Sequence, residues 1–151
     1  MTAQRVIEFR LAMTLPAADA AVRAALQEQG FGILTEVDVA ATLRQKLGVE
    51  TKPHRLLGAC NPRLAQASLE AEPNVGAFLP CGIALREGAS AAETIVVIQN
   101  PELIADAFSA PALRAIGTEA LARLTAAIER VGAEAVGTPA GELYRDAPVR
   151  V

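Results

Sequence analysis

The sequence predicts an α+β domain in which helices pack on a mixed β-sheet. Along the chain, short segments with alternating or β-branched residues are interspersed with longer segments whose apolar residues recur at helical spacing. Two of the short segments, 81–87 and 94–99, follow each other directly, and the small and polar residues between them favour a hairpin. The expected order is therefore β-α-β-α-β-α-β-β-α, with a short helical turn before the last helix.

The first three elements follow from alternation and from one glycine. Residues 5–13 alternate polar and apolar side chains, which predicts a strand. A helix is expected from Pro16 to Gly30, where glycine can adopt the positive φ that ends a helix. Residues 31–37 predict a second strand, one face of which is expected to carry Phe31, Ile33, Thr35 and Val37.

The remaining elements are marked by caps and by an amphipathic stripe. Asp38 is expected to cap a short helix that Gly48 ends. Residues 54–60 predict a third strand with two largely apolar faces, which a central place in the sheet would explain. The longest helix is expected at 111–131, with an apolar stripe of Leu113, Ile116, Ala120, Leu121, Leu124, Ile128 and Val131.

The length of 151 residues is typical of one domain. We place that domain at residues 1–131. Residues 132–151 hold three glycines and two prolines, so we expect them to form an irregular C-terminal tail.

Charge and composition exclude several classes of partner. Fourteen basic and seventeen acidic residues give a net charge of −3, and no basic run offers a surface for nucleic acid. Aromatic residues are only 3% of the chain, so platforms for base stacking are not expected. The first residues lack a signal-peptide core, and no apolar stretch approaches the roughly 18 residues of a membrane span. We therefore expect a soluble cytoplasmic protein without a membrane or nucleic-acid partner, whose cysteines are reduced.

The two cysteines are the main candidates for chemistry, because each lies beside a proline. Asn61 can cap a helix and Pro62 can open it, so Cys60 is expected to end a strand directly before a helix. A thiol at that point lies near the positive end of the helix dipole, which would lower its pKa. The alternative is that Cys60 and Cys81 are buried residues of the core, as free cysteines often are.

Other residues offer weaker candidates. Glu36 is either an acid or base near a site or the outward residue of a half-exposed strand, and the second is favoured. His54 is the only histidine, and an extended strand would place it about 20 Å from Cys60, so no metal site is expected. No motif of a hydrolytic triad or a phosphate-binding loop is present, so no catalytic residue and no cofactor is assigned.

At these motifs the chain resembles the family called domain of unknown function 302. The resemblance covers about residues 5–131 and is strongest where a Cys-Asn-Pro is followed about twenty residues later by Pro-Cys. It implies a compact α/β domain found mainly in bacteria and archaea, and it implies no established reaction. The matching residues are Gly30-Phe31-Gly32, Thr35-Glu36-Val37, Leu57-Gly58-Ala59-Cys60-Asn61-Pro62, Ala65, Leu79-Pro80-Cys81 and Pro101.

Three functions remain open. The favoured one is a module that binds a small-molecule ligand at a site formed by Cys60, Asn61, Pro62, Cys81 and Glu36. The second is a redox or sulfur-handling protein in which Cys60 is the reactive thiol and Cys81 resolves it. The third is a structural, homo-oligomeric module with inert cysteines. We also expect a homodimer with the tail or the long helix at its interface.

Overall fold

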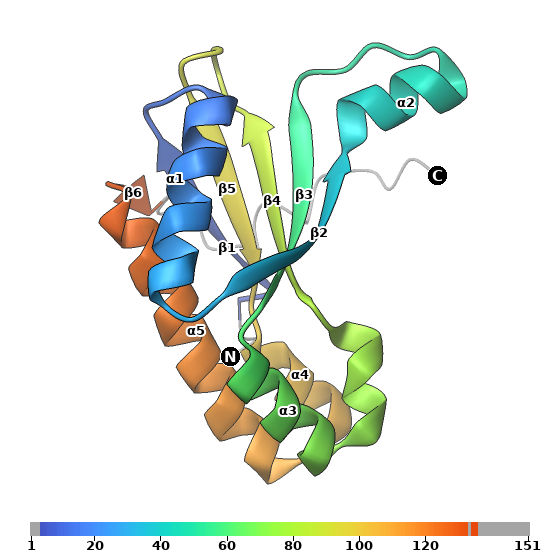
Figure 1. Ribbon diagram of the computed structural model, residues 1–151, viewed down its shortest axis with the longest axis vertical. Helices are drawn as coiled ribbons and strands as arrows, with labels where there is room; N and C mark the ends of the chain where they lie inside the picture. Colours follow the sequence, from blue (N-terminus) through green and yellow to red (C-terminus); the bar gives the residue numbers. More distant parts are fainter. Residues whose placement is uncertain (1–3, 133, 136–151) are drawn as a thin grey trace.

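The computed structural model describes residues 4–132 and 134–135. Its elements follow the expected order, with a 3₁₀ helix and a short final strand in addition (Figure 1). The strands are β1 (Val6–Leu11), β2 (Gly32–Asp38), β3 (His54–Cys60), β4 (Cys81–Glu87), β5 (Thr94–Gln99) and β6 (Glu134–Ala135). The helices are α1 (Leu15–Glu28), α2 (Val39–Leu47), α3 (Pro62–Ala71), η1 (Pro73–Phe78), α4 (Glu102–Phe108) and α5 (Pro111–Arg130).

The strands form one sheet in the order β2-β3-β4-β5-β1-β6. The α+β class is confirmed, but the expected mixed pairing is wrong, because every described pair is antiparallel. Alternation specifies which residues share a face of a strand and contains no information on the direction of its neighbours. The hairpin of β4 and β5 is present, with Ile83 opposite Ile98.

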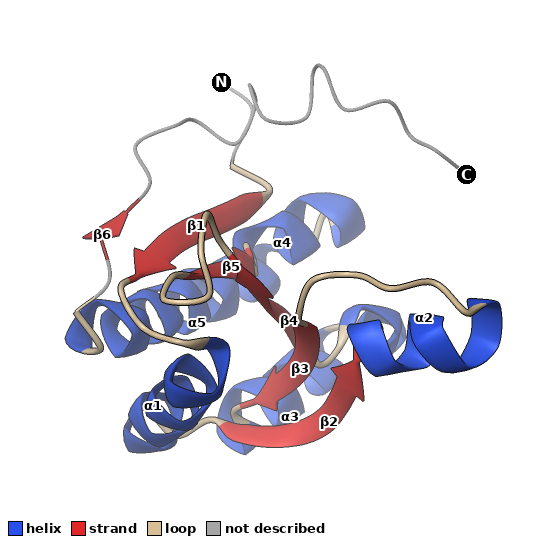
Figure 2. Cartoon of the chain, turned by 90° about the horizontal axis from the view of Figure 1, so that it is seen from above, coloured by secondary structure: helices blue, strands red, loops and turns tan. Residues whose placement is uncertain are grey.

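Helices α1 and α5 lie side by side on one face of this sheet (Figures 1 and 2). The strand residues on that face are almost fully buried; Leu57, Leu85 and Val96, for example, are at most 2% exposed. The stripe of α5 completes the layer, and Leu124 and Ile128 are fully buried. The long helix therefore uses its apolar side inside the domain and has none left for a partner.

A second, smaller hydrophobic cluster lies beyond one end of the sheet. It contains Val75, Ile104, Ala105 and Leu113, which come from η1, α4 and α5. Gly117 permits α4 and α5 to approach closely, because a Cβ there would lie 2.8 Å from the carbonyl oxygen of Pro101. The domain thus has a main core under the sheet and a satellite core at the ends of β3 and β4 (Figure 1).

The second face of the sheet carries no helix among the residues described. As expected, β3 lies inside the sheet, between β2 and β4. Its apolar residues on the second face are nevertheless not covered, since Leu56 is 41% exposed. A bulge between Ile33 and Thr35 also changes the predicted face of β2. Ile33 packs against the main core, whereas Val37 pairs with Leu56 on the open face.

Two observations concern the ends of the chain. Glu134 and Ala135 pair with Arg10 and Phe9, so the expected irregular tail begins with a short strand at the sheet edge. The rest of the predicted tail, residues 136–151, lies outside the described residues. No helix in the described part of the chain has the length and hydropathy needed to cross a membrane.

Candidate functional site

The start of α3 organises the region around the cysteines. As predicted, Asn61 is the N-cap: its side-chain oxygen accepts a hydrogen bond from the backbone N–H of Leu64 at 3.3 Å. Its side-chain nitrogen donates to the carbonyl oxygen of Gln29 at 3.5 Å, which joins the beginning of α3 to the end of α1. Gly30 has a φ of 85°, and a Cβ there would lie 3.0 Å from this nitrogen. The tight contact explains why a glycine follows α1.

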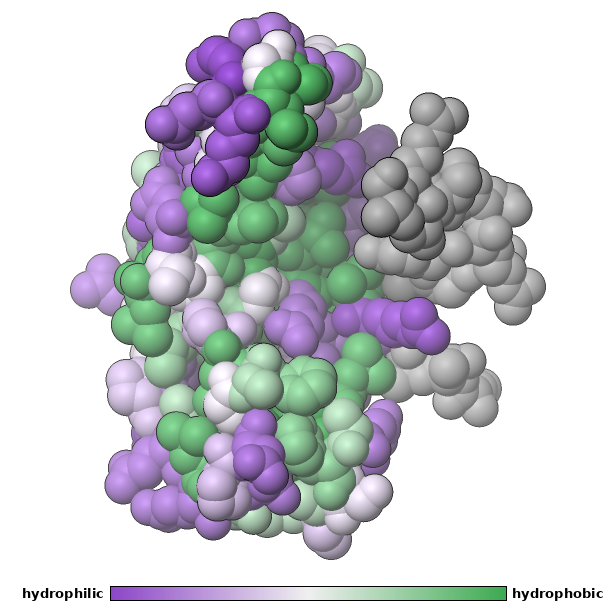
Figure 3. Space-filling view, turned by 90° about the vertical axis from the view of Figure 1, so that its right-hand side faces the viewer, coloured by the Kyte–Doolittle hydropathy of each residue, from purple (hydrophilic) through white to green (hydrophobic). Residues whose placement is uncertain are grey.

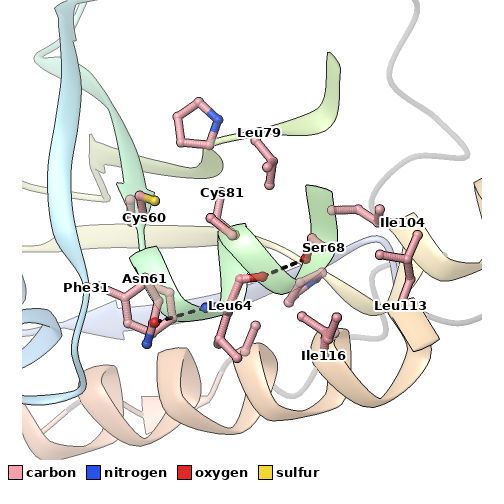
Figure 4. Close-up of a pocket in the computed structure, with 16 residues that line it drawn as sticks. Phe31, Cys60, Asn61, Leu64, Ser68, Leu79, Cys81, Ile104, Leu113 and Ile116 are labelled. Carbon is pink, nitrogen blue, oxygen red and sulfur yellow. Dashed lines mark hydrogen bonds between the residues drawn. The ribbon is translucent and has the colours of Figure 1, made fainter. Parts of the chain in front are cut away.

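A hollow lies between the two hydrophobic clusters, where β3 and β4 end and α3 crosses α5 (Figure 4). It contains about 470 Å³ of space free of protein atoms, including the open solvent at its mouth. Its wall comes from five stretches of the chain: Phe31, Ala59, Cys60, Asn61, Leu64, Ala65, Ser68, Leu79, Pro80, Cys81, Pro101, Ile104, Leu113, Ile116, Gly117 and Ala120.

The wall of the hollow is apolar and carries no charged side chain. Its two polar side chains are Asn61 and Ser68. Asn61 caps α3, and the Ser68 hydroxyl donates to the carbonyl oxygen of Leu64 at 2.8 Å (Figure 4). Because both side chains are already hydrogen-bonded to protein groups, the remaining surface favours an uncharged, apolar guest.

The register of the sheet brings the two cysteines together. Ala59 pairs with Cys81, and Cys60 is the next residue of β3. A paired Cα distance of about 5 Å and one further residue of 3.8 Å place the Cα atoms of Cys60 and Cys81 within about 9 Å. The register agrees with the predicted proximity below 10 Å, and both residues contribute to the wall of the hollow. Both thiols are free.

The expected activation of Cys60 is not found. Burial raises the pKa of the Cys60 thiol instead of lowering it. Burial and the neighbouring Cys60 raise the pKa of Cys81 to about 11. Both side chains line the same hollow, close enough for the charge of one thiolate to disfavour ionisation of the other. At neutral pH the site therefore presents two neutral thiols.

Glu36 lies away from this site, on the edge strand β2. Its carboxylate contacts Arg23 at 2.7 Å and Arg55 at 3.5 Å. The same two arginines bind Asp19, a buried residue of α1, at 2.9 and 2.7 Å. The structure thus does not bring Glu36 to Cys60, and its ion pairs join β2 and β3 to α1. Its role in a ligand site is not supported by its position.

No group of three or more His, Cys, Asp and Glu side chains that could hold a metal is found among the described residues. His54 begins β3 opposite Arg86, at the far end of the strand from Cys60. Burial and the charge of Arg86 lower the pKa of His54.

The sequence did not reveal the small residues that leave the space of the hollow unfilled. These are small side chains and turns at the meeting points of elements, among them Ala59, Ala65, Gly117 and Ala120. The available signal was the presence of small residues at positions of the expected apolar stripes where a large side chain would fill the core. It indicates looser packing but does not say which elements meet there.

Comparison with known proteins identifies the family of this chain. The family described as "Domain of unknown function DUF302" matches residues 7–131. The chain belongs to the DUF302 family. A similar solved structure is that of an uncharacterized conserved DUF302 protein from Bacillus stearothermophilus, which is 25% identical and has a TM-score of 0.79. The match covers 85% of this chain and 99% of that chain, and no curated protein matches.

Proposed function

We propose that this DUF302 protein is a binding module that takes a small, uncharged, apolar group into the hollow between α3, α5 and the ends of β3 and β4. The observation that carries this proposal is the chemistry of the wall. It is apolar, it has no charge, and its two polar side chains are already hydrogen-bonded to protein groups. A charged ligand would lose its hydration there without finding a partner.

The place of the hollow supports the same function. It lies where the main core and the satellite core meet, so its opposite walls belong to separately packed groups of elements. Leu64 on α3 and Leu113 on α5 face it from different sides (Figure 4). A small shift of α3 relative to α5 would widen it without breaking a sheet hydrogen bond. Ligand pockets commonly occur at such junctions.

The two thiols add polarisable surface to this wall. Neutral sulfur is a weak donor and acceptor and makes favourable contacts with apolar and aromatic groups. Because the pKa values of both thiols are raised, Cys60 and Cys81 act as contacts in this proposal, not as nucleophiles.

The test is an NMR titration of the full chain with toluene and with 1-hexanol, compared with hexanoate as a charged ligand of similar size. We expect saturable shifts of the backbone amides of Leu64, Ser68 and Cys81 with the two neutral ligands. Hexanoate should give none, because its carboxylate has no partner in the wall. Equal binding of hexanoate, or shifts spread over the whole surface, would contradict the proposal.

Two matched variants of α3 control this experiment. Ala65→Phe introduces a ring at a residue of the wall, whereas Gln66→Phe introduces the same ring on an exposed neighbour. The first should abolish the titration and the second should leave it unchanged. A loss in both variants would point to a general effect on α3.

The second candidate, thiol chemistry, is favoured by one observation, the neighbouring positions of Cys60 and Cys81. Two opposed facts make it the weaker function. Burial raises the pKa of the Cys60 thiol, and burial together with Cys60 raises that of Cys81 to about 11. Neither thiol is therefore a ready nucleophile near neutral pH.

The third candidate, a structural oligomer with inert cysteines, predicts no ligand at all. Ligand binding and self-association are compatible, and we propose that the protein is a homodimer located in the cytoplasm. The two free thiols support this location, because disulfides are rare in the cytosol. The interface is argued below from a different part of the molecule.

A further inference from the structure

Residues 32–56 form an arm, comprising β2, α2 and the beginning of β3, in which no residue is buried. Five of its large apolar side chains are strongly exposed: Leu34, Val37, Leu47, Val49 and Leu56. Helix α2 has only nine residues and none of them is buried. Isolated helices of this length are marginal in water, and helices in proteins are stabilised mainly by packing of one face. The arm therefore lacks the apolar contacts that would stabilise it among residues 4–132 and 134–135.

The arm adjoins the open face of the sheet. A row of apolar residues crosses this face from strand to strand, with Val37 opposite Leu56, Leu56 opposite Ala84, and Ala84 opposite Val97. Gly82 and Ala84 leave a hollow over β4, which holds about 530 Å³ of space free of protein atoms, including open solvent. Figure 3 looks onto this side of the molecule and shows hydrophobic residues gathered below α2. The view from above shows α2 at the end of the sheet, beside its open face (Figure 2).

The open face is electrically neutral. Arg10 lies 3.3 Å from Glu93, and Arg86 lies 3.6 Å from Glu8. His54, whose pKa is lowered by burial and by Arg86, is neutral near pH 7. Such a surface does not attract a polyanion or a strongly charged protein. It can meet an identical surface without repulsion between like charges.

We propose that the open face of the sheet and the arm together form the surface on which a second copy of this chain docks. The arm adds nearly balanced charge, with Arg44, Lys46, Lys52 and Arg55 against Glu36, Asp38 and Glu50. In an isologous dimer each patch must complement itself, which an apolar surface of nearly balanced charge can do. A standard interface takes roughly 20–30 residues from each partner. The arm alone supplies 25 residues without a buried side chain. The long helix, expected from the sequence to be an interface, is not part of this surface, because its apolar stripe lies in the core.

The test is sedimentation of the full chain at micromolar concentrations together with one pair of variants. We expect the wild type to have twice the mass of the 15.7 kDa chain. Leu56→Glu on the open face should raise the dimer dissociation constant at least about 100-fold, because the lost apolar contact occurs twice in an isologous interface. Leu69→Glu on α3 changes a leucine of similar exposure, 43% against 41%, and should leave the dimer intact. A wild type that stays monomeric, or equal effects of both variants, would overturn the proposal.

Hydrogen exchange gives a second readout that needs no substitution. The amides of β2 and α2 should exchange faster after dilution below the dissociation constant, while those of α5 should not change. A chain shortened to end at Ala135 should remain a dimer. The proposal fails if hydrogen exchange in the arm does not change on dilution. It also fails if exchange in the arm becomes faster only when the chain is shortened, because the arm is then covered by the removed residues and not by a second copy. None of these outcomes depends on ligand binding in the hollow between α3 and α5.

Discussion

Replacing Asn61 with alanine tests how the site is held together. Asn61 is only 8% exposed, and both ends of its amide are used. The oxygen accepts from the N–H of Leu64 at 3.3 Å, and the nitrogen donates to the carbonyl oxygen of Gln29 at 3.5 Å. Alanine removes both hydrogen bonds and leaves the buried N–H of Leu64 without its acceptor.

The expected loss follows from these two contacts. Losing an N-cap costs about 1 kcal/mol. The bond to Gln29 is long and adds at most about 0.5 kcal/mol. The Gln29 carbonyl keeps a second donor, Arg123, at 3.4 Å, so no orphaned acceptor increases the cost. The free energy of unfolding should therefore fall by about 1–1.5 kcal/mol.

Urea unfolding followed by circular dichroism measures this change. With an m value of about 2 kcal/mol/M, the midpoint should fall by about 0.6 M. Asn74→Ala, at an exposed asparagine of η1, is the matched control and should stay within about 0.5 kcal/mol of the wild type. All proteins are compared at one concentration, since a dimer would add a concentration-dependent term. The reasoning is refuted if Asn61→Ala and Asn74→Ala cost the same.

Three further results are expected. Gly117→Ala should lower stability in thermal unfolding by about 1–3 kcal/mol, because the new Cβ would lie 2.8 Å from the Pro101 carbonyl oxygen. Alanine has the higher helix propensity, so a gain in stability would contradict this contact. Timed alkylation at pH 8, read by mass spectrometry, should label Cys60 before Cys81, because the pKa of Cys81 is raised to about 11. Cys60→Ser should remove the faster phase, and faster labelling of Cys81 would contradict this order. Between pH 9 and 11 the unfolded state releases the Cys81 proton while the folded state keeps it, because burial raises the pKa in the folded state. As the pH rises, the stability of the wild type should therefore fall by up to about 2–3 kcal/mol more than that of Cys81→Ala. Parallel pH profiles of the two proteins would show that folding does not hold the thiol neutral.

Local features of the fold were predictable because single residues specify them. Asp38 and Gly48 cap α2 at its two ends, and Asn61 and Pro62 open α3, as expected from the sequence. These residues act through hydrogen bonds and dihedral angles within a few positions of themselves, so they do not depend on the rest of the chain. The proximity of the cysteines was predictable because the two motifs end neighbouring strands.

Features that depend on distant contacts were not predictable in the same way. The bulge at Ile33 and Thr35 changed which side chains of β2 face the core, and alternation alone cannot show an inserted residue. The hollow requires segments from Phe31 to Ala120 to meet, and apolar periodicity does not reveal how well distant segments fill the space between them. The pKa of Cys60 was predicted in the wrong direction because the helix dipole was weighed without its burial.

The central claim, that the hollow accepts a small apolar guest, is tested most directly by crystals of the full chain under xenon pressure. Xenon enters apolar cavities of proteins and is readily located by its anomalous scattering. The account predicts xenon between Leu64, Cys81 and Ile116, and its loss in Ala65→Phe but not in Gln66→Phe. Crystals of the wild type in which this hollow stays empty of xenon, or in which Ala65→Phe binds it equally well, would contradict the account.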